Sequence, residues 1–106
     1  MQKTRLTLQE TLESLLGSKN VYYNPPETLK MEFPCIVYNR TGIMEMKADN
    51  AKYINHTIYK IVILSSKPDH PVIKKILEIP MTRFSNQYVK NNFYHDVIIL
   101  IQKEKQ

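Results

Sequence analysis

Leucines at helical spacing dominate the first part of the chain. Four of them recur at intervals that place them on one stripe of an α-helix, namely Leu8, Leu12, Leu15 and Leu16. Thr7 and Glu10 have the spacing of a capping box, and Thr4 offers a start one turn earlier. Gly17 follows, and glycine readily adopts the left-handed conformation in which many helices end. The pattern predicts a helix that ends at Gly17.

Beyond this helix, aromatic and β-branched residues favour extended segments. The first of these, Val21-Tyr22-Tyr23, comes shortly before Pro25-Pro26. Because proline has no N–H group to donate, pairing is blocked on that side and the segment belongs at the edge of a sheet. We expect residues 27–32 to form a loop.

Two longer strands and a hairpin turn come next. Residues 34–39 carry apolar side chains on both faces, which predicts a strand covered on both sides. Thr41-Gly42 marks a bulge or bend before residues 43–48, where methionines alternate with charged residues. After the turn signal Asp49-Asn50, residues 53–64 return antiparallel, polar in the early half and apolar in the later half. One end of that strand therefore belongs in the core, and the other points to solvent or to a partner.

A second helix follows. Asp69 is the expected N-cap, Pro71 suits the first turn, and Pro80 ends the helix. Its apolar stripe consists of Ile73, Ile76 and Leu77.

The remaining residues complete an α+β pattern. Residues 81–89 predict a weaker strand and residues 93–101 a strong one, with Asn91-Asn92 as the turn between them. The polar residues 102–106 are expected to be loose. The order is α-β-β-β-α-β-β, which predicts one domain at residues 1–106 with a mainly antiparallel sheet and two helices packed on it.

Composition narrows the possible functions. The chain has 106 residues and a net charge of +5, from 15 Lys and Arg against 10 Asp and Glu. The positive residues are dispersed, whereas a nucleic-acid site calls for a dense basic stripe, so we favour a solvated surface. No apolar run approaches the length of about 18 residues expected of a membrane-spanning helix, and the first residues lack the apolar core of a secretory signal. The single cysteine excludes an intramolecular disulfide and an all-cysteine metal cage, and intracellular folding is the natural expectation.

Candidate catalytic histidines are poorly supported. His95 and Asp96 are adjacent in a strand, so their side chains point to opposite faces and cannot form a hydrogen-bonded base and orienting acid. Asp69 beside His70 is explained by helix capping. A metal site of His56, His95 and a carboxylate is geometrically possible if their strands pair, but scattered single ligands carry no spacing signal. Structural or surface roles are therefore favoured for these histidines.

Other reactive groups are also poorly supported. Cys35 lies in an apolar strand, a setting that favours an inert buried thiol over a nucleophile. The two glycines, Gly17 and Gly42, stand far apart, which excludes the clustered glycines of phosphate-binding loops. We expect no catalytic residues, no metal site and no cofactor.

Tyrosine is the dominant aromatic residue and admits two interpretations. Tyrosines interleaved with Lys52, Lys60 and Lys90 can stack the bases of a single-stranded nucleic acid. The alternative, which we favour, is that they bury their rings and keep their hydroxyl groups wet at sheet edges or protein interfaces. The seven tyrosines are Tyr22, Tyr23, Tyr38, Tyr53, Tyr59, Tyr88 and Tyr94.

Apolar residues on extended edges exceed what a small core needs. Such strands promote aggregation unless a partner covers them, so these positions point to self-assembly, and symmetric rings are a common outcome of head-to-tail contacts. The residues concerned are Tyr22 and Tyr23 in the edge segment and Met44, Met46, Tyr53 and Ile54 in the hairpin.

Several stretches of the sequence form one further pattern. They are Asn20-Val21-Tyr22-Tyr23-Asn24-Pro25-Pro26, Phe33-Pro34-Cys35-Ile36-Val37-Tyr38, Ala48-Asp49-Asn50-Ala51-Lys52-Tyr53, Ile79-Pro80-Met81 through Phe84, and Tyr94-His95-Asp96-Val97. In these stretches the chain resembles the tail-terminator or tail-completion proteins of long non-contractile tails, short proteins of bacteriophages and of prophages in Gram-positive bacteria. The resemblance covers nearly the whole chain after the first helix, and it is one of pattern rather than of a chemical signature.

The resemblance implies an α+β subunit that forms a ring with its own copies, a hexamer. Such a ring caps the finished tail tube, ends its polymerisation and presents a surface to the head connector proteins, while DNA passes through as cargo. It also implies a place at the tail–head junction of the virion, assembly in the cytoplasm of the host bacterium, and no membrane partner. The family offers no catalytic residues to carry over. For subunit or tail-tube contacts the candidates are Tyr22, Tyr23, Met44, Met46, Tyr53 and Ile54.

Two alternatives stay open. The protein can be another component of the head–tail connector, such as a head-completion or adaptor ring. It can also be a small nucleic-acid-binding regulator, for which clustered base-stacking aromatics and a basic stripe would be needed. An enzyme has the least support, because no set of residues supplies a nucleophile, a base and an orienting group together.

Overall fold

A computed structural model describes residues 5–47 and 53–104 of the chain, and the side chains of residues 6–43 and 56–102. The described residues form helices and strands in the order α-β-β-β-α-β-β, as the sequence predicts. These elements are α1 (Arg5–Leu16), β1 (Val21–Tyr23), β2 (Cys35–Lys47), β3 (Tyr53–Ser65), α2 (Pro71–Leu77), β4 (Thr82–Lys90) and β5 (Phe93–Glu104).

The strands form one five-stranded sheet in the order β1-β2-β3-β5-β4. β1 runs parallel to β2, with Val21 opposite Ile36, and every other neighbouring pair is antiparallel. The sheet is therefore mixed but mostly antiparallel, and the predicted α+β class is confirmed. β1 lies at the sheet edge and ends before Pro25, as the missing proline N–H predicts.

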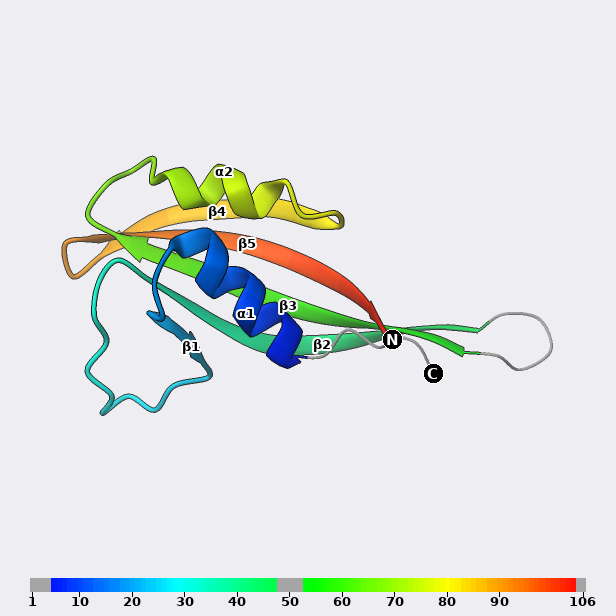
Figure 1. Ribbon diagram of the computed structural model, residues 1–106. Helices are drawn as coiled ribbons and strands as arrows, with labels where there is room; N and C mark the ends of the chain where they lie inside the picture. The colour runs from blue at the N-terminus through cyan, green and yellow to red at the C-terminus, as the bar shows by residue number, and fades with distance from the viewer. Residues whose placement is uncertain (1–4, 48–52, 105–106) are drawn as a thin grey trace.

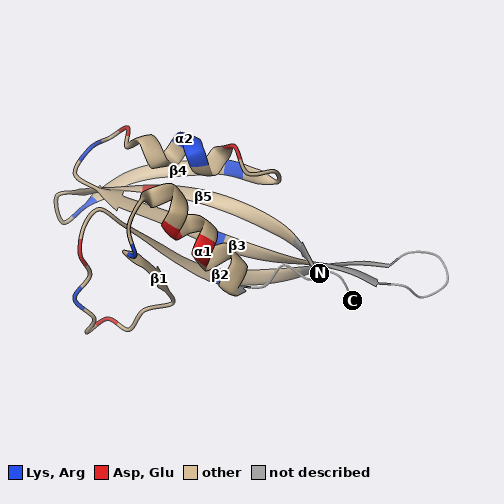
Figure 2. Cartoon of the chain, in the orientation of Figure 1, with Lys and Arg blue, Asp and Glu red and all other residues tan. Residues whose placement is uncertain are grey.

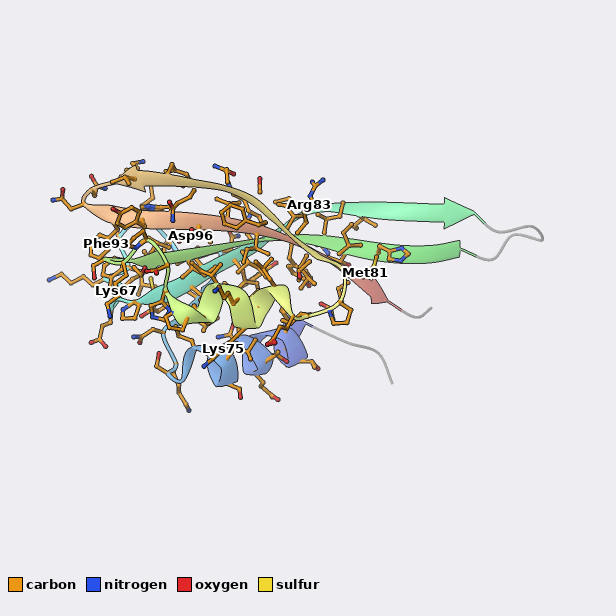
Figure 3. All side chains as sticks on the ribbon, turned by 90° about the horizontal axis from the view of Figure 1, so that it is seen from above. Lys67, Lys75, Met81, Arg83, Phe93 and Asp96 are labelled. Atoms are coloured by element: carbon orange, nitrogen blue, oxygen red, sulfur yellow. The ribbon has the colours of Figure 1, made fainter. Side chains whose placement is uncertain are left out.

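Both helices lie on the same face of this sheet, which we call the helix face (Figures 1 and 3). The main core fills the space between the two helices and the sheet, because the apolar stripes of α1 and α2 pack on alternate residues of the central strands. Its buried residues are Leu8, Leu12, Val21, Ile36, Tyr38, Tyr59, Ile61, Ile63, Val72, Ile76, Ile98 and Leu100.

A smaller cluster lies on the opposite face, which we call the far face. Its buried members are Cys35, Val62, Leu64 and Val97, and half-buried Tyr22, Met31, Val37 and Ile99 pack against them. Because Met31 belongs to the connection between β1 and β2, that connection covers part of the far face. The predicted cover on both faces is thereby confirmed for residues 35–38, whereas Pro34 is exposed.

The first helix ends where the sequence predicts and begins earlier. Gly17 has a φ of +82°, and its N–H donates to the carbonyl of Glu13 at 2.9 Å, which closes the last turn. Thr7 lies inside the helix, where its carbonyl oxygen accepts from the hydroxyl of Thr11 at 2.9 Å. The capping box at Thr7 is therefore wrong, and Thr4 lies outside the described residues.

The second helix is capped by His70 and not by Asp69. Pro71 occupies the first helical position, so the capping position falls on residue 70. The Nδ1 atom of His70 accepts from the N–H of Val72 at 3.1 Å. The predicted N-cap at Asp69 was therefore one residue too early. After the helix, the hydroxyl of Thr82 donates to the carbonyls of Leu77 and Ile79 and fixes the turn into β4.

The ends of the long strands also differ from expectation in one place. The predicted irregularity at Thr41-Gly42 is confirmed by a register shift between Arg40 and Gly42. The loose tail at residues 102–106 is wrong for residues 102–104, because β3 pairs with β5 as far as Glu104 and Gln102 is buried. Residues 105–106 and the predicted turn Asp49-Asn50 lie outside the described residues.

Candidate assembly surface

The six residues predicted at contacts fall into two groups along one side of the sheet. Tyr22 and Tyr23 lie on β1, which pairs only with Ile36–Tyr38 at the start of β2. The other four lie on the β2–β3 hairpin, where Met46 is opposite Ile54, Lys47 is opposite Tyr53 and Met44 is opposite His56. The structure places these four residues close together on the hairpin. Measured along β2, they lie about 20 Å from the positions opposite the two tyrosines.

The two tyrosines differ in their contacts within the chain and in their exposure to solvent. Tyr22 is half-buried against the far-face cluster, and its hydroxyl accepts from the N–H of Glu32 at 3.2 Å. It therefore holds the β1–β2 connection in place. Tyr23 is 36% exposed, with its ring 5.0 Å from the ring of Tyr38. Of the pair, Tyr23 is the more accessible to a partner.

The hairpin of β2 and β3 extends beyond the rest of the sheet (Figure 1). Within the part of the chain that the structure describes, β5 pairs with β3 as far as Asn55, and Tyr53 and Ile54 pair with β2 alone. The side chains of Met44, Met46, Tyr53 and Ile54 lie outside those that the structure describes. At the base of the extension, Ile43 is 55% exposed.

The outer edge of β2 is open along this extension. β1 pairs with residues 36–38, and within residues 5–47 and 53–104 no strand pairs with the same edge of β2 from residue 39 onward. An open strand edge presents N–H and C=O groups that another strand can satisfy.

Among residues 5–47 and 53–104, no strand pairs with the outer side of the opposite margin, so this margin is a second open edge, and the sequence pattern did not predict it as a contact surface. β4 is the outermost strand there, and every residue of it is exposed except half-buried Thr82. Large apolar side chains are among them: Phe84 is 43%, Tyr88 41% and Val89 62% exposed. The signal in the sequence was the interleaving of these residues with polar ones, which leaves β4 without a continuous apolar face.

The described residues do not assemble a metal site from the histidines. β3 and β5 do pair, but His95 is opposite Leu64, eight positions along β3 from His56 and about 26 Å away. The ring of His95 instead stacks on Tyr88, with centroids 4.7 Å apart. No group of three or more potential ligands that could hold a metal occurs among the described residues.

Asp96 is buried on the helix face beside the start of α2 (Figure 3). Gln87 donates to its Oδ1 atom at 2.7 Å and to the carbonyl of Pro68 at 2.8 Å. Burial raises the pKa of Asp96, while the hydrogen bond from Gln87 and the nearby His95 act to lower it. This carboxyl group therefore connects β4 and β5 to the chain entering α2.

Two polar side chains near the start of α2 are bonded within the chain. A hollow of about 240 Å³ at this end of the sheet is lined by Phe33, Pro34, Ser65, Ser66, Lys67, His70 and Phe93. The hydroxyl of Ser65 donates to the carbonyl of Lys67 at 2.8 Å, and His70 caps the helix. Burial, and to a smaller extent Lys67 and Lys75, lower the pKa of His70. On the far face, burial raises the pKa of the Cys35 thiol to about 11, which agrees with the predicted inert thiol.

Basic residues are spread over the described part of the molecule (Figure 2). They lie on α2, on the connecting loops and along the strands, with acidic residues of α1 and the loops between them. The described residues therefore show basic and acidic positions interspersed in this view.

No protein-family model matches the chain, and no curated protein matches it in sequence. Neither helix that the structure describes is long and apolar enough to cross a membrane. What the chain offers for judging its function is therefore its own pair of open strand edges and its extended hairpin.

Proposed function

We propose that this protein is a ring-forming subunit that caps the tail tube of a long-tailed bacteriophage, ends polymerisation of the tube and offers a surface to the head connector. One observation carries the proposal: in the part of the chain that the structure describes, the sheet is open at both margins, along β2 beyond Tyr38 and along β4. The resemblance of the sequence to tail-terminator proteins supplies the context.

Open margins on opposite sides of one sheet suit a ring. A cyclic ring uses two different complementary surfaces on each subunit, and strand addition is a common way to join them. The hairpin adds a second element that can reach a neighbour or the tail tube. In this proposal the contact residues are those predicted from the sequence, Tyr22, Tyr23, Met44, Met46, Tyr53 and Ile54, and the ring is a hexamer.

DNA is passing cargo in this proposal, not a ligand. A lumen through which DNA slides must not bind phosphates tightly, and the dispersed Lys and Arg residues support weak binding. Binding of duplex DNA that is tight and falls steeply with added salt would contradict the proposed role.

The decisive experiment is electron microscopy of virions assembled without this protein. Overlong or headless tails would support tail termination, because nothing would then stop addition of tube subunits. Tails of normal length joined to leaking heads would overturn it and favour another connector component. The unmodified gene, supplied from a plasmid, must restore normal particles.

The predicted hairpin contacts have a separate test. We expect the double variant Met46→Ala and Tyr53→Ala to lose ring formation, measured by light scattering. The two substitutions remove two predicted contact side chains from the same part of the hairpin. Ser14→Ala, at an exposed position of α1, is the matched control and should leave the ring unchanged. Unchanged ring formation in the double variant would show that the hairpin is not a contact.

A further inference from the structure

The two open edges match in length and in direction. β4 has nine residues, Thr82–Lys90, and β2 continues for nine residues, 39–47, after the part that β1 covers. We call these stretches the β4 edge and the β2 edge. Three successive antiparallel pairings separate β2 from β4, so the two strands run antiparallel to each other. A second copy placed alongside in the same orientation therefore brings its β4 edge antiparallel to the β2 edge.

Each edge also contains one skipped residue. Ser85 lies in the register shift between Phe84 and Asn86, and Thr41 lies in the shift between Arg40 and Gly42. One extra residue in a single strand moves all later side chains to the other face, whereas one in each strand restores the match.

We propose that the β4 edge of one copy pairs antiparallel with the β2 edge of the next, in the register that sets Phe84 opposite Ile43. This inference rests on the proposed function in that its partner is a second copy of the chain. In this register Gln87 meets Arg40 and Tyr88 meets Asn39, because the two skipped residues compensate. The pairing spans residues 82–88 of the β4 edge and residues 39–45 of the β2 edge, and it ends where β1 begins to cover β2.

In this register, residues that lie opposite each other across the contact point to the same face of the sheet. Phe84 lies opposite the core residue Ile98, and Ile43 lies opposite buried Thr57, so both belong to the helix face. Both are exposed in the single chain, Phe84 by 43% and Ile43 by 55%. Pairing places one apolar side chain against the other, and cross-strand apolar pairs stabilise antiparallel sheets.

The irregular edges also explain selectivity. A flat, regular strand that adds to either edge loses its match of faces at the bulge, which is how edge bulges discourage indiscriminate pairing. A strand with a compensating bulge retains the match, and each copy of this chain supplies one at Ser85 and one at Thr41. The contact joins different edges of the two copies and leaves one of each free, so it can continue around a ring.

Disulfide trapping tests this contact. Residues directly opposite in an antiparallel pair have Cα atoms about 4.5–5.5 Å apart, within the range that a disulfide spans. We expect a mixture of Phe84→Cys and Ile43→Cys single variants to form a covalent mixed dimer under mild oxidation, and the double variant to form a ladder of higher oligomers. The parent chain is the control, since its buried Cys35 has a pKa raised to about 11 and should form no cross-link.

A second pair checks the register. A mixture of Tyr88→Cys and Asn39→Cys should also cross-link, whereas Phe84→Cys with Asn39→Cys should not, because Asn39 lies about 10 Å of strand away from Ile43. Homodimers of Phe84→Cys alone would indicate a twofold β4–β4 contact and would overturn the inference.

The outcomes separate this contact from the proposed function. Oligomers that light scattering detects but neither pair of cysteines traps would overturn the contact and leave the proposed ring standing. Normal tails in particles that lack the protein would overturn the proposed function, while a mixed cross-link in concentrated protein would still support the contact. A chain that neither associates nor cross-links at any concentration, nor in assembled particles, contradicts both.

Discussion

β3 and β4 are both paired strands of one sheet, yet they differ in what surrounds them. In β3, Ile61–Ser65 are all buried, and Ile61 and Ile63 are fully so. In β4, residues 83–90 are all exposed. Hydrogen bonding between strands therefore does not require burial of side chains, and the core of this protein is concentrated in the central strands beneath the two helices.

Polar contacts, rather than apolar packing, hold β4 against the rest of the molecule. Thr82 at its start hydrogen-bonds to the end of α2, and Gln87 near its centre bonds to Asp96 and Pro68. The apolar side chains of the strand are left on the surface, where they are available to a second copy.

The largest expected change in the free energy of unfolding comes from a core substitution in β3, compared with a surface substitution in β4. Ile61→Ala removes a fully buried side chain beneath the helices and should lower the free energy of unfolding by about 2–5 kcal/mol. Val89→Ala removes a 62% exposed side chain and should change it by less than about 0.5 kcal/mol. Urea unfolding of dilute protein measures both without stabilisation by association. Equal losses would show that β4 contributes to the core of the single chain.

A smaller effect is expected at the polar attachment of β4. Gln87→Ala removes the donor to Asp96 and Pro68 and should cost about 1–3 kcal/mol. Exposed Asn86→Ala is the control and should change stability by less than about 0.5 kcal/mol.

The same site predicts a pH dependence. Because burial raises the pKa of Asp96, its folded form holds a proton more tightly than its unfolded form, and this contribution is lost as the pH rises above 3.8 through the folded pKa. Asp96→Asn keeps an acceptor for Gln87 and removes the titration, so its unfolding free energy should vary less with pH over this window. A profile parallel to that of the parent chain would contradict the assignment.

The smallest effect separates the two candidate caps of α2. His70→Ala should cost about 1 kcal/mol through loss of the acceptor for Val72, whereas Asp69→Ala should change stability by less than about 0.5 kcal/mol. Because the pKa of His70 is lowered in the folded chain, its contribution is present above 6.5 and is lost as the pH falls through the folded pKa. Urea unfolding above and below this pH should show a decline in the parent that His70→Ala lacks. A larger loss in Asp69→Ala would restore the original prediction.

Features set by neighbouring residues could be predicted from the sequence. The end of α1 depends on Gly17, whose positive φ suits glycine, and the irregularity in β2 lies beside the second glycine, Gly42. The hairpin positions Met46 and Ile54 could likewise be placed together, because antiparallel strands joined by a turn fix their own register.

Features set by distant partners could not. Gln102 looks like part of a polar tail until β3 is seen to continue beside it as far as Asn55. The parallel pairing of β1 depends on where the connection after Pro26 leads. The residues of β4 and its neighbours in sequence do not indicate that β4 is the outermost strand. The predicted contact residues therefore cover one margin of the sheet and omit the other.

Cys35 gives the molecule a chemical reporter at one end. It is the chain's single thiol, fully buried at the start of β2, opposite Leu64, and its pKa of about 11 leaves it almost entirely un-ionised at neutral pH. Alkylation therefore has to wait until this part of the sheet separates. The rate of labelling then measures how often the sheet opens around the start of β2. A slower rate upon subunit association would show that contact at one margin reduces opening at this end of the sheet.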